Sequence, residues 1–258
     1  KSHWGAVYAR LAGTTHPKSG MMSNVFISPM SLGHAAAEKH AGFYYGGMSE
    51  VGALPISCAP FHPTLGGGKI IPGKTTASGL MADLQLRLPR EQLDDRRALL
   101  KQLDGLQRQL DTRDAGLQSI DHYQQQAHDV LLRGISQAFD LSRENPRLVE
   151  RYDTSEFKTP AACLKRDKNG KMPAQSQTVL GKQLLLARRL CEAGCGFVTV
   201  GMNDWDMHGN ANSYSIPEGM PVMGGALDKA VSALLTDLHD RGLSEKILLV
   251  MTGEMGRT

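Results

Sequence analysis

Cysteine is scarce in this sequence, which holds four among 258 residues, at positions 58, 163, 191 and 195. Cys191 and Cys195 are four residues apart across the expected end of a helix, but no second closely spaced pair completes a tetrahedral zinc set. A zinc site built on cysteine is therefore not expected. We interpret the cysteines as small apolar packing residues, and they do not fix the redox compartment.

Long apolar runs are missing as well. No stretch reaches the roughly 18 consecutive apolar residues of a membrane-spanning helix, so we expect no span in this chain. No signal peptide is visible. Because the sequence begins at Lys1 without Met and stops at Thr258 in the middle of a motif, we expect an interior fragment of a longer protein.

A strong charge imbalance is the third absence. The formal net charge is +3, and no run of Lys and Arg forms a stripe that could follow a phosphate backbone, so we expect no nucleic-acid partner. The hydrophobic share of 41% and the charged share of 21% are ordinary for a protein with a hydrophobic core. The length suits one large α/β domain or two small ones.

The sequence changes character along its length. Residues 1–80 are rich in Gly, Pro, Ser and His with poor periodicity, so we expect an irregular, loop-rich part of the domain. Residues 81–145 carry amphipathic helical patterns and a short helical piece around Ser136–Phe139, which predict an inserted helical hairpin. The composition of residues 141–175 predicts a polar, flexible connection. We assign residues 146–258 to an α/β core.

The last third has the clearest periodicity. A helix is predicted after Ser176, which suits an N-cap, and Gly194 suits the position just past its end. The stretch GFVTVGM predicts a short buried strand. A second helix is predicted from the apolar stripe of Met223, Leu227, Ala230, Leu234 and Leu238, with Gly242 closing it, and KILLVMT predicts a second strand.

This alternation of helices and apolar strands predicts an α/β fold with a mostly parallel sheet and helices on both faces. Ligands of such sheets bind beyond the carboxyl ends of the strands. The polar loops 203–210 and 253–258 follow the two predicted strands directly. If the strands are neighbours, both loops lie on one rim.

The rim loops hold residue types that bind divalent cations. In NDWDMHGN, Asp206 and His208 are two apart, so their side chains project to the same side of an extended segment, and Asp204 would converge only in a helical turn. Glu254 could add an oxygen ligand from the second loop. Arg257 could bind an anionic oxygen of phosphate or sulfate, because its guanidinium matches such groups in a bidentate manner.

Each of these residues also has a plain structural interpretation. Asp206 could cap a loop, His208 could be a hydrogen-bonded loop histidine, Glu254 could start a helix and Arg257 could pair with a carboxylate. Trp205 is expected to pack the loop onto the domain. Isolated histidines are commonly surface or packing residues, so no role is assigned to a further set: His34, His40, His62, His122 and His128.

The stretches LLLARRLCEAGCGFVTVGMNDWDMHGN and ALDKAVSALLTDLHDRGLSEKILLVMTGEMGRT resemble the sulfatase-like domain-of-unknown-function family 1501. That family's pattern includes ARRL-EAG, a WDxH loop and an apolar strand ending in EFGRTP. Asp206 and His208 match the WDxH pair, and Glu254 and Arg257 match the EFGRT pair, with Met255 in place of Phe. The resemblance covers most of the chain and is specific in residues 176–258.

The resemblance implies an alkaline-phosphatase-like fold with a divalent metal (Zn, Mg, Mn or Ca) held by Asp206, His208 and Glu254. It further implies hydrolysis of phosphate or sulfate esters of small molecules or glycans, and an exported or periplasmic location. The sequence identifies no nucleophile. The sulfatase signature is not met, because Cys58-Ala59-Pro60 continues with Phe61 and His62.

Two other classes of function stay open. Residues Gly68–Thr75 match the P-loop pattern G-x-x-x-x-G-K-[ST], but Pro60 and Pro63 do not suit the buried strand that must precede it. A non-catalytic binding or scaffold protein on the same fold is the other class, because one fold hosts many functions. The predicted helical hairpin would suit protein interaction.

Overall fold

The computed structural model describes residues 2–32, 51–63, 69–70, 75–76, 92, 95, 98, 135–166, 176–203, 205, 207–209 and 213–253. Its helices and strands are α1 (Trp4–Ala12), β1 (Asn24–Ile27), β2 (Lys69–Ile70), β3 (Thr75–Thr76), α6 (Ser136–Phe139), α7 (Pro146–Arg151), α8 (Ala161–Arg166), α9 (Leu180–Glu192), β4 (Phe197–Val200), α10 (Ile216–Gly219) and α11 (Gly225–Asp240). Short 3-10 turns include η1 (Pro29–Leu32), η4 (Ile56–Cys58), η5 (Leu141–Arg143) and η6 (Ser176–Val179), and η7 (Met220–Gly224) is a π-helical turn.

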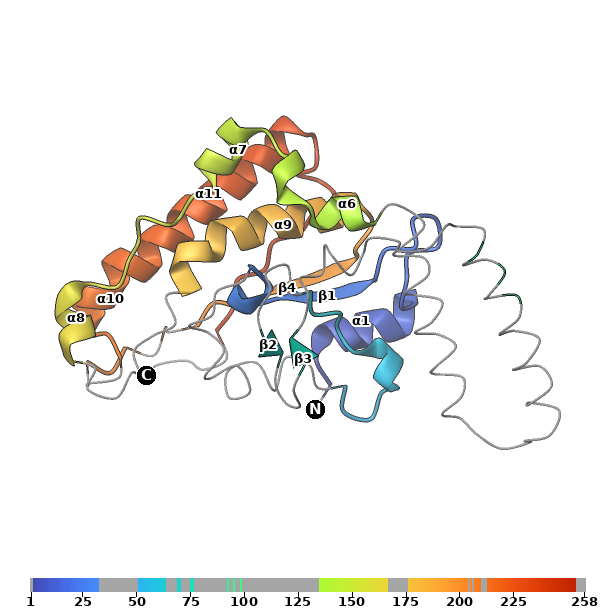
Figure 1. Ribbon diagram of the computed structural model, residues 1–258, viewed down its shortest axis with the longest axis horizontal. Helices are drawn as coiled ribbons and strands as arrows, with labels where there is room; N and C mark the ends of the chain where they lie inside the picture. Colours follow the sequence, from blue (N-terminus) through green and yellow to red (C-terminus); the bar gives the residue numbers. More distant parts are fainter. Residues whose placement is uncertain are drawn as a thin grey trace.

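The centre of the fold is a parallel pair of strands, in which Asn24 of β1 faces Phe197 of β4 and Ile27 faces Val200. Figure 1 shows α9 and then α11 on one side of this pair and α1 on the other. β1 is buried throughout, whereas β4, predicted as a buried strand, is only half-buried. The other strand pair in the described ranges is the two-residue antiparallel β2–β3, so a mostly parallel sheet stays a prediction.

α9 is the helix predicted after Ser176, but the 3-10 turn η6 comes first. The prediction of Ser176 as its N-cap is wrong, because the N-cap position is occupied by Val179. Leu186 packs into the cluster that contains β1 residues, and Leu185 packs into the cluster that contains α11 residues. Burying one such leucine side chain stabilises the fold by about 1.5–3 kcal/mol relative to leaving it exposed. Gly194 follows the helix with φ +102°, which confirms the predicted glycine position.

α11 is the second predicted helix. Its predicted apolar stripe is confirmed at the buried positions Ala230, Leu234 and Leu238. Met223 is also buried, but it belongs to the preceding turn η7. Leu227 is only partly buried and packs against the cluster that contains Ala230 and Leu234. Gly242 has φ +65° just past the helix end, as predicted. Neither α11 nor any other helix in the described ranges is long and apolar enough to cross a bilayer.

The region predicted as a flexible connection, 141–175, contains two short helices, α7 and α8. The Asn145 side chain accepts a hydrogen bond from the N–H of Arg147, and Pro146 occupies the first helical position. Proline suits that position because its missing N–H would have no partner in the helix. The Asn-Pro pair therefore starts a helix here. Tyr152, just after α7, and Cys163, within α8, are buried in the core.

The N-terminal region was predicted to be irregular, and that interpretation misses α1 and β1. α1 buries Ala6 and Ala9 against the segment 51–58, so it supplies one layer of the core. The predicted hairpin over 81–145 falls mainly outside the described residues. Within it Gln92, Asp95 and Ala98 are helical and exposed, and α6 coincides with the short helical piece predicted at Ser136–Phe139.

The strand predicted at KILLVMT is wrong for this structure, because residues 246–252 belong to no strand. Ile247 and Leu249 pack against the α9–α11 cluster, whereas Leu248 is 86% and Val250 69% exposed. This alternation is that of an extended segment. In the described part of the chain no strand hydrogen-bonds to it, so it lacks the ladder that defines a strand.

Candidate functional site

β1 and β4 end at the same edge because they run parallel in register. We call this the carboxyl edge and define it by Ile27, Ser28, Val200 and Gly201. The N–H of Gly201 donates to the carbonyl of Ile27 over 2.9 Å. From α9, Nε2 of Gln183 donates to the carbonyls of both Ile27 and Gly201, over 3.3 and 3.2 Å. One buried side chain thus joins the two strand ends.

Polar side chains are buried at this edge, where a packing core would have apolar ones. They are Ser28, Ser31, Ser176, Gln177 and Gln183, all with essentially no exposed surface. Oε1 of Gln177 and Oε1 of Gln183 have no hydrogen-bond partner among the described residues. A buried acceptor without a partner costs free energy.

The edge extends past β1 on the side away from β4. Phe61 forms a parallel bridge with Val25, and the N–H of Phe26 donates to the carbonyl of Phe61 over 2.9 Å. The next residue, His62, is thereby carried alongside the end of β1. Its Nε2 lies 2.7 Å from Oγ of Ser28.

His62 is exposed, although one face of its ring packs on the ring of Phe26 with centroids 5.1 Å apart. Burial lowers the pKa of His62 below its ordinary value of 6.5. The imidazole is therefore neutral at pH 7. Sequence reasoning assigned His62 no role, and it did not single out Ser28. The one available signal is that Ser28 follows an apolar run, NVFI, directly.

The loop after β4 carries the predicted metal ligands. Its root is held by Ser176, whose Oγ donates to the carbonyl of Asn203 over 3.3 Å. Asp204 and Asp206 lie outside the described residues. Trp205, expected to pack the loop onto the domain, is 40% exposed. Met207 is buried in a cluster with three other residues, namely Cys163, Tyr214 and Met223.

His208 follows Met207 and is exposed. Its backbone N–H donates to Oγ of Ser213 over 3.1 Å. Gly209 adopts φ +70°, a conformation that favours glycine, and its N–H donates to the carbonyl of Tyr214 over 2.8 Å. The backbone that carries the His208 imidazole is thus fixed on both sides.

The other predicted site residues, Glu254 and Arg257, lie outside the described residues. Among the residues that the structure describes, no group of three or more His, Cys, Asp or Glu side chains lies close enough to hold a metal ion. The convergence of Asp206, His208 and Glu254 therefore stays a prediction.

The P-loop interpretation of Gly68–Thr75 conflicts with the described part of that motif. Ile70 pairs with Thr75 and Lys69 pairs with Thr76 in an antiparallel ladder, β2–β3. A P-loop needs a strand, a phosphate-binding loop and then a helix that starts at its Lys-Ser/Thr end. Thr75 stands in a strand instead, so the described residues do not show the strand–loop–helix arrangement of a P-loop.

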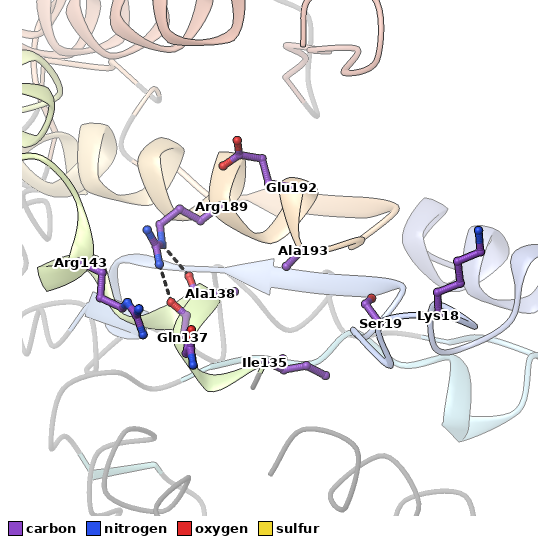
Figure 2. Close-up of a pocket in the computed structure, with 9 residues that line it drawn as sticks. All are labelled: Lys18, Ser19, Ile135, Gln137, Ala138, Arg143, Arg189, Glu192 and Ala193. Carbon is purple, nitrogen blue, oxygen red and sulfur yellow. Dashed lines mark hydrogen bonds between the residues drawn. The ribbon is translucent and has the colours of Figure 1, made fainter. Parts of the chain in front are cut away.

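A separate cavity of about 580 Å³ lies between α6, α9 and the turn before β1 (Figure 2). Arg189 is its central cation, but its guanidinium is already engaged: Nε donates to the carbonyl of Ala138 over 2.9 Å, Nη2 to the carbonyl of Gln137, and Nη1 pairs with Glu144. The Arg189 guanidinium is therefore structural, and none of the predicted site residues lines this cavity.

Comparison with known proteins gives one match. The model of a family described as "Protein of unknown function (DUF1501)" matches residues 49–258. No curated protein and no solved structure matches the chain. The matched range includes His62, the loop after β4 and the C-terminal segment with Glu254 and Arg257.

Proposed function

This chain belongs to the DUF1501 family, and from that premise we propose that it is a metal-dependent hydrolase of phosphate or sulfate esters acting at the carboxyl edge. The observation that carries the proposal is the parallel pairing of β1 and β4. It brings both strand ends to one polar edge, from which the loop with Asp206 and His208 departs. The resemblance to sulfatase-like proteins of the alkaline-phosphatase-like superfamily supports the same chemistry.

The proposed donor set fits a divalent cation. Two carboxylates, from Asp206 and Glu254, and one imidazole, from His208, are a combination that binds Zn²⁺ or Mn²⁺ and, with water, Mg²⁺. The bound ion would supply a Lewis acid that polarises the ester oxygen. Arg257 would hold the anionic group of the ester, because a guanidinium binds two such oxygens at once.

The described residues contribute the rigidity that such a site requires. The loop is anchored at its root through Asn203, in its middle through buried Met207, and at its end through Gly209. Because its backbone is held in this way, His208 would bind a cation without first losing the conformational entropy of a mobile segment.

The second candidate is a non-catalytic binding protein on the same fold. It is favoured by the exposed apolar side chains of the 246–252 segment, since Leu248, Val250 and Met251 are each more than half exposed. Exposed apolar residues that lie close together are typical of surfaces that contact other proteins. Absence of any metal-dependent turnover would favour this candidate.

The test is hydrolysis of p-nitrophenyl phosphate and p-nitrophenyl sulfate by the untagged protein, supplied in turn with Zn²⁺, Mn²⁺, Mg²⁺ and Ca²⁺. Asp206→Ala and His208→Ala are expected to lower kcat/KM by more than the roughly 10–100-fold seen when only a supporting residue of a metal site is lost. His239→Ala, which removes an exposed histidine of α11, is the matched control and should keep wild-type turnover. Turnover that survives in both loop variants would contradict the proposal.

A further inference from the structure

His62 combines two features that set it apart from the other described histidines. Its Nε2 is 2.7 Å from Oγ of Ser28, a side chain with no exposed surface directly after β1. His62 itself is exposed. The imidazole thus has one nitrogen held from inside the protein at the carboxyl edge, while the ring reaches the surface.

The hydroxyl of Ser28 selects the tautomer of this imidazole. A neutral ring has one N–H and one acceptor nitrogen. If Nε2 carried the proton, it would donate to the Ser28 oxygen over the 2.7 Å contact. The Ser28 hydroxyl hydrogen would then have no acceptor among the described residues. A buried hydroxyl without an acceptor is unfavourable. The favoured arrangement has Ser28 donating to Nε2, which leaves the proton on Nδ1.

The ring plane is also fixed. Phe26 packs against the imidazole at an interplanar angle of 32°, and Phe61, the preceding residue, is hydrogen-bonded to β1 on both its N–H and its carbonyl. In the described part of the chain, Nδ1 of His62 has no hydrogen-bond partner. A preorganised donor nitrogen is therefore presented at the edge.

We propose that His62 is a ligand-binding residue of the carboxyl edge, and that Ser28 positions it as the Nδ1–H tautomer so that it donates a hydrogen bond to an anionic oxygen of a phosphate or sulfate group. The class of ligand rests on the proposed function. The inference adds a hydrogen-bond donor from the segment that bridges to β1 at Phe61. No sequence motif assigns this donor. Ser28 acts through His62 and does not itself contact the ligand.

The experiment follows the imidazole nitrogens of ¹⁵N-labelled full-length chain by NMR while inorganic phosphate is added. The His62 signals are assigned as those missing in His62→Gln. In the wild-type protein at pH 7 we expect Nδ1 to carry the proton and to show a saturable shift with phosphate. The His239 signals, from an exposed histidine on α11, are the internal control and should not move.

Two variants separate positioning from mere stability. Ser28→Ala should lose the Nδ1–H preference and weaken phosphate binding roughly tenfold, the effect of losing one hydrogen bond to a charged group. Ser28→Thr keeps the hydroxyl and should retain both the tautomer and the affinity. If Ser28→Ala does not fold, the wild-type titration still decides whether His62 binds phosphate as the Nδ1–H tautomer.

The outcomes separate this inference from the proposed function. A saturable shift at His62 without any ester hydrolysis supports the inference and contradicts the hydrolase. The inference is overturned, and the hydrolase left standing, if the protein hydrolyses esters but phosphate does not shift the His62 signals. The same holds if the protein hydrolyses esters and Nε2 of His62 carries the proton. Absence of both hydrolysis and phosphate response overturns both.

Discussion

Nε of Arg188 lies 2.9 Å from Oδ2 of Asp237, and this ion pair is buried between α9 and α11. The same guanidinium reaches Glu144 over 3.1 Å and Glu192 over 2.6 Å. Tyr152 donates its hydroxyl to Asp237 over 3.1 Å. Burial and the Asp237 carboxylate raise the pKa of Tyr152 above its ordinary range, so the hydroxyl keeps its proton. This network joins both long helices to the turn before α7.

Asp237→Ala is expected to lower the free energy of unfolding by about 3–5 kcal/mol, the cost of breaking a buried ion pair. The substitution leaves Arg188 buried with one carboxylate fewer and Tyr152 without its acceptor. Asp240→Ala is the matched control on the same helix. It removes an exposed pair with Arg151 at 3.5 Å, so a loss of less than about 1 kcal/mol is expected. The free energy of unfolding of both variants is measured by urea denaturation. Equal losses in Asp237→Ala and Asp240→Ala would contradict the buried network.

Gly181→Ala is expected to destabilise the protein strongly, because a Cβ at Gly181 would lie 1.6 Å from the backbone carbonyl oxygen of Tyr152. Backbone atoms cannot give way as a flexible side chain can, so α9 would have to move off α7. Gly224→Ala is the control, since its Cβ would meet only the Met220 side-chain end at 3.6 Å. It should be neutral or slightly stabilising, as Ala favours a helix over Gly by about 1 kcal/mol. Thermal unfolding of both variants checks the contrast.

Acid should weaken the fold through Glu144. Burial alone would raise the pKa of this carboxyl, but hydrogen bonds from Arg188 and Arg189 outweigh burial and hold the pKa below its ordinary value of 4.5. A carboxyl with a depressed folded-state pKa contributes stability above pH 4.5, and this contribution is lost as the pH falls through the folded-state pKa. Unfolding measured from pH 7 to pH 3 should therefore show a shallower decline in Glu144→Gln than in wild type. Glu150→Gln, at an exposed position of α7, should decline like wild type.

The cysteines should be unreactive in the native protein. Burial and neighbouring Glu192 raise the pKa of the Cys191 thiol to about 11, and burial raises that of Cys195 to about 12. Since the thiolate is the reactive form, both should react slowly with dithiobisnitrobenzoate at pH 8. Cys58 and Cys163 are likewise buried thiols. Guanidinium should release four thiols, and fast native labelling of Cys195 would contradict the packing described.

The C-terminal core is largely predictable from the sequence. α9 and α11 follow from apolar periodicity over more than three turns, and Gly194 and Gly242 mark their ends because each needs positive φ. The four-residue strand β4 lies between them as expected. KILLVMT has the apolar pattern of a strand, but a strand also needs a hydrogen-bonded neighbour, and a local pattern does not specify one.

The N-terminal layer and the carboxyl edge are less predictable. β1 has four residues, too few for a periodicity to be distinguished from a loop. Ser28 and His62 are 34 residues apart and meet only because Phe61 bridges to β1. No spacing rule connects such residues. The predicted cluster of Asp206, His208 and Glu254 depends in the same way on tertiary placement, and two of its members lie outside the described residues.

The central claim is that Asp206, His208 and Glu254 hold one divalent cation, and its most direct test is the metal content of the untagged full-length chain. Elemental analysis after incubation with Zn²⁺, Mn²⁺, Mg²⁺ and Ca²⁺ and removal of free ions is expected to find stoichiometric bound metal in wild type and in His239→Ala. Asp206→Ala, His208→Ala and Glu254→Ala should each lose it while remaining folded by circular dichroism. Wild-type protein free of metal, or three variants that retain it, would contradict the claim.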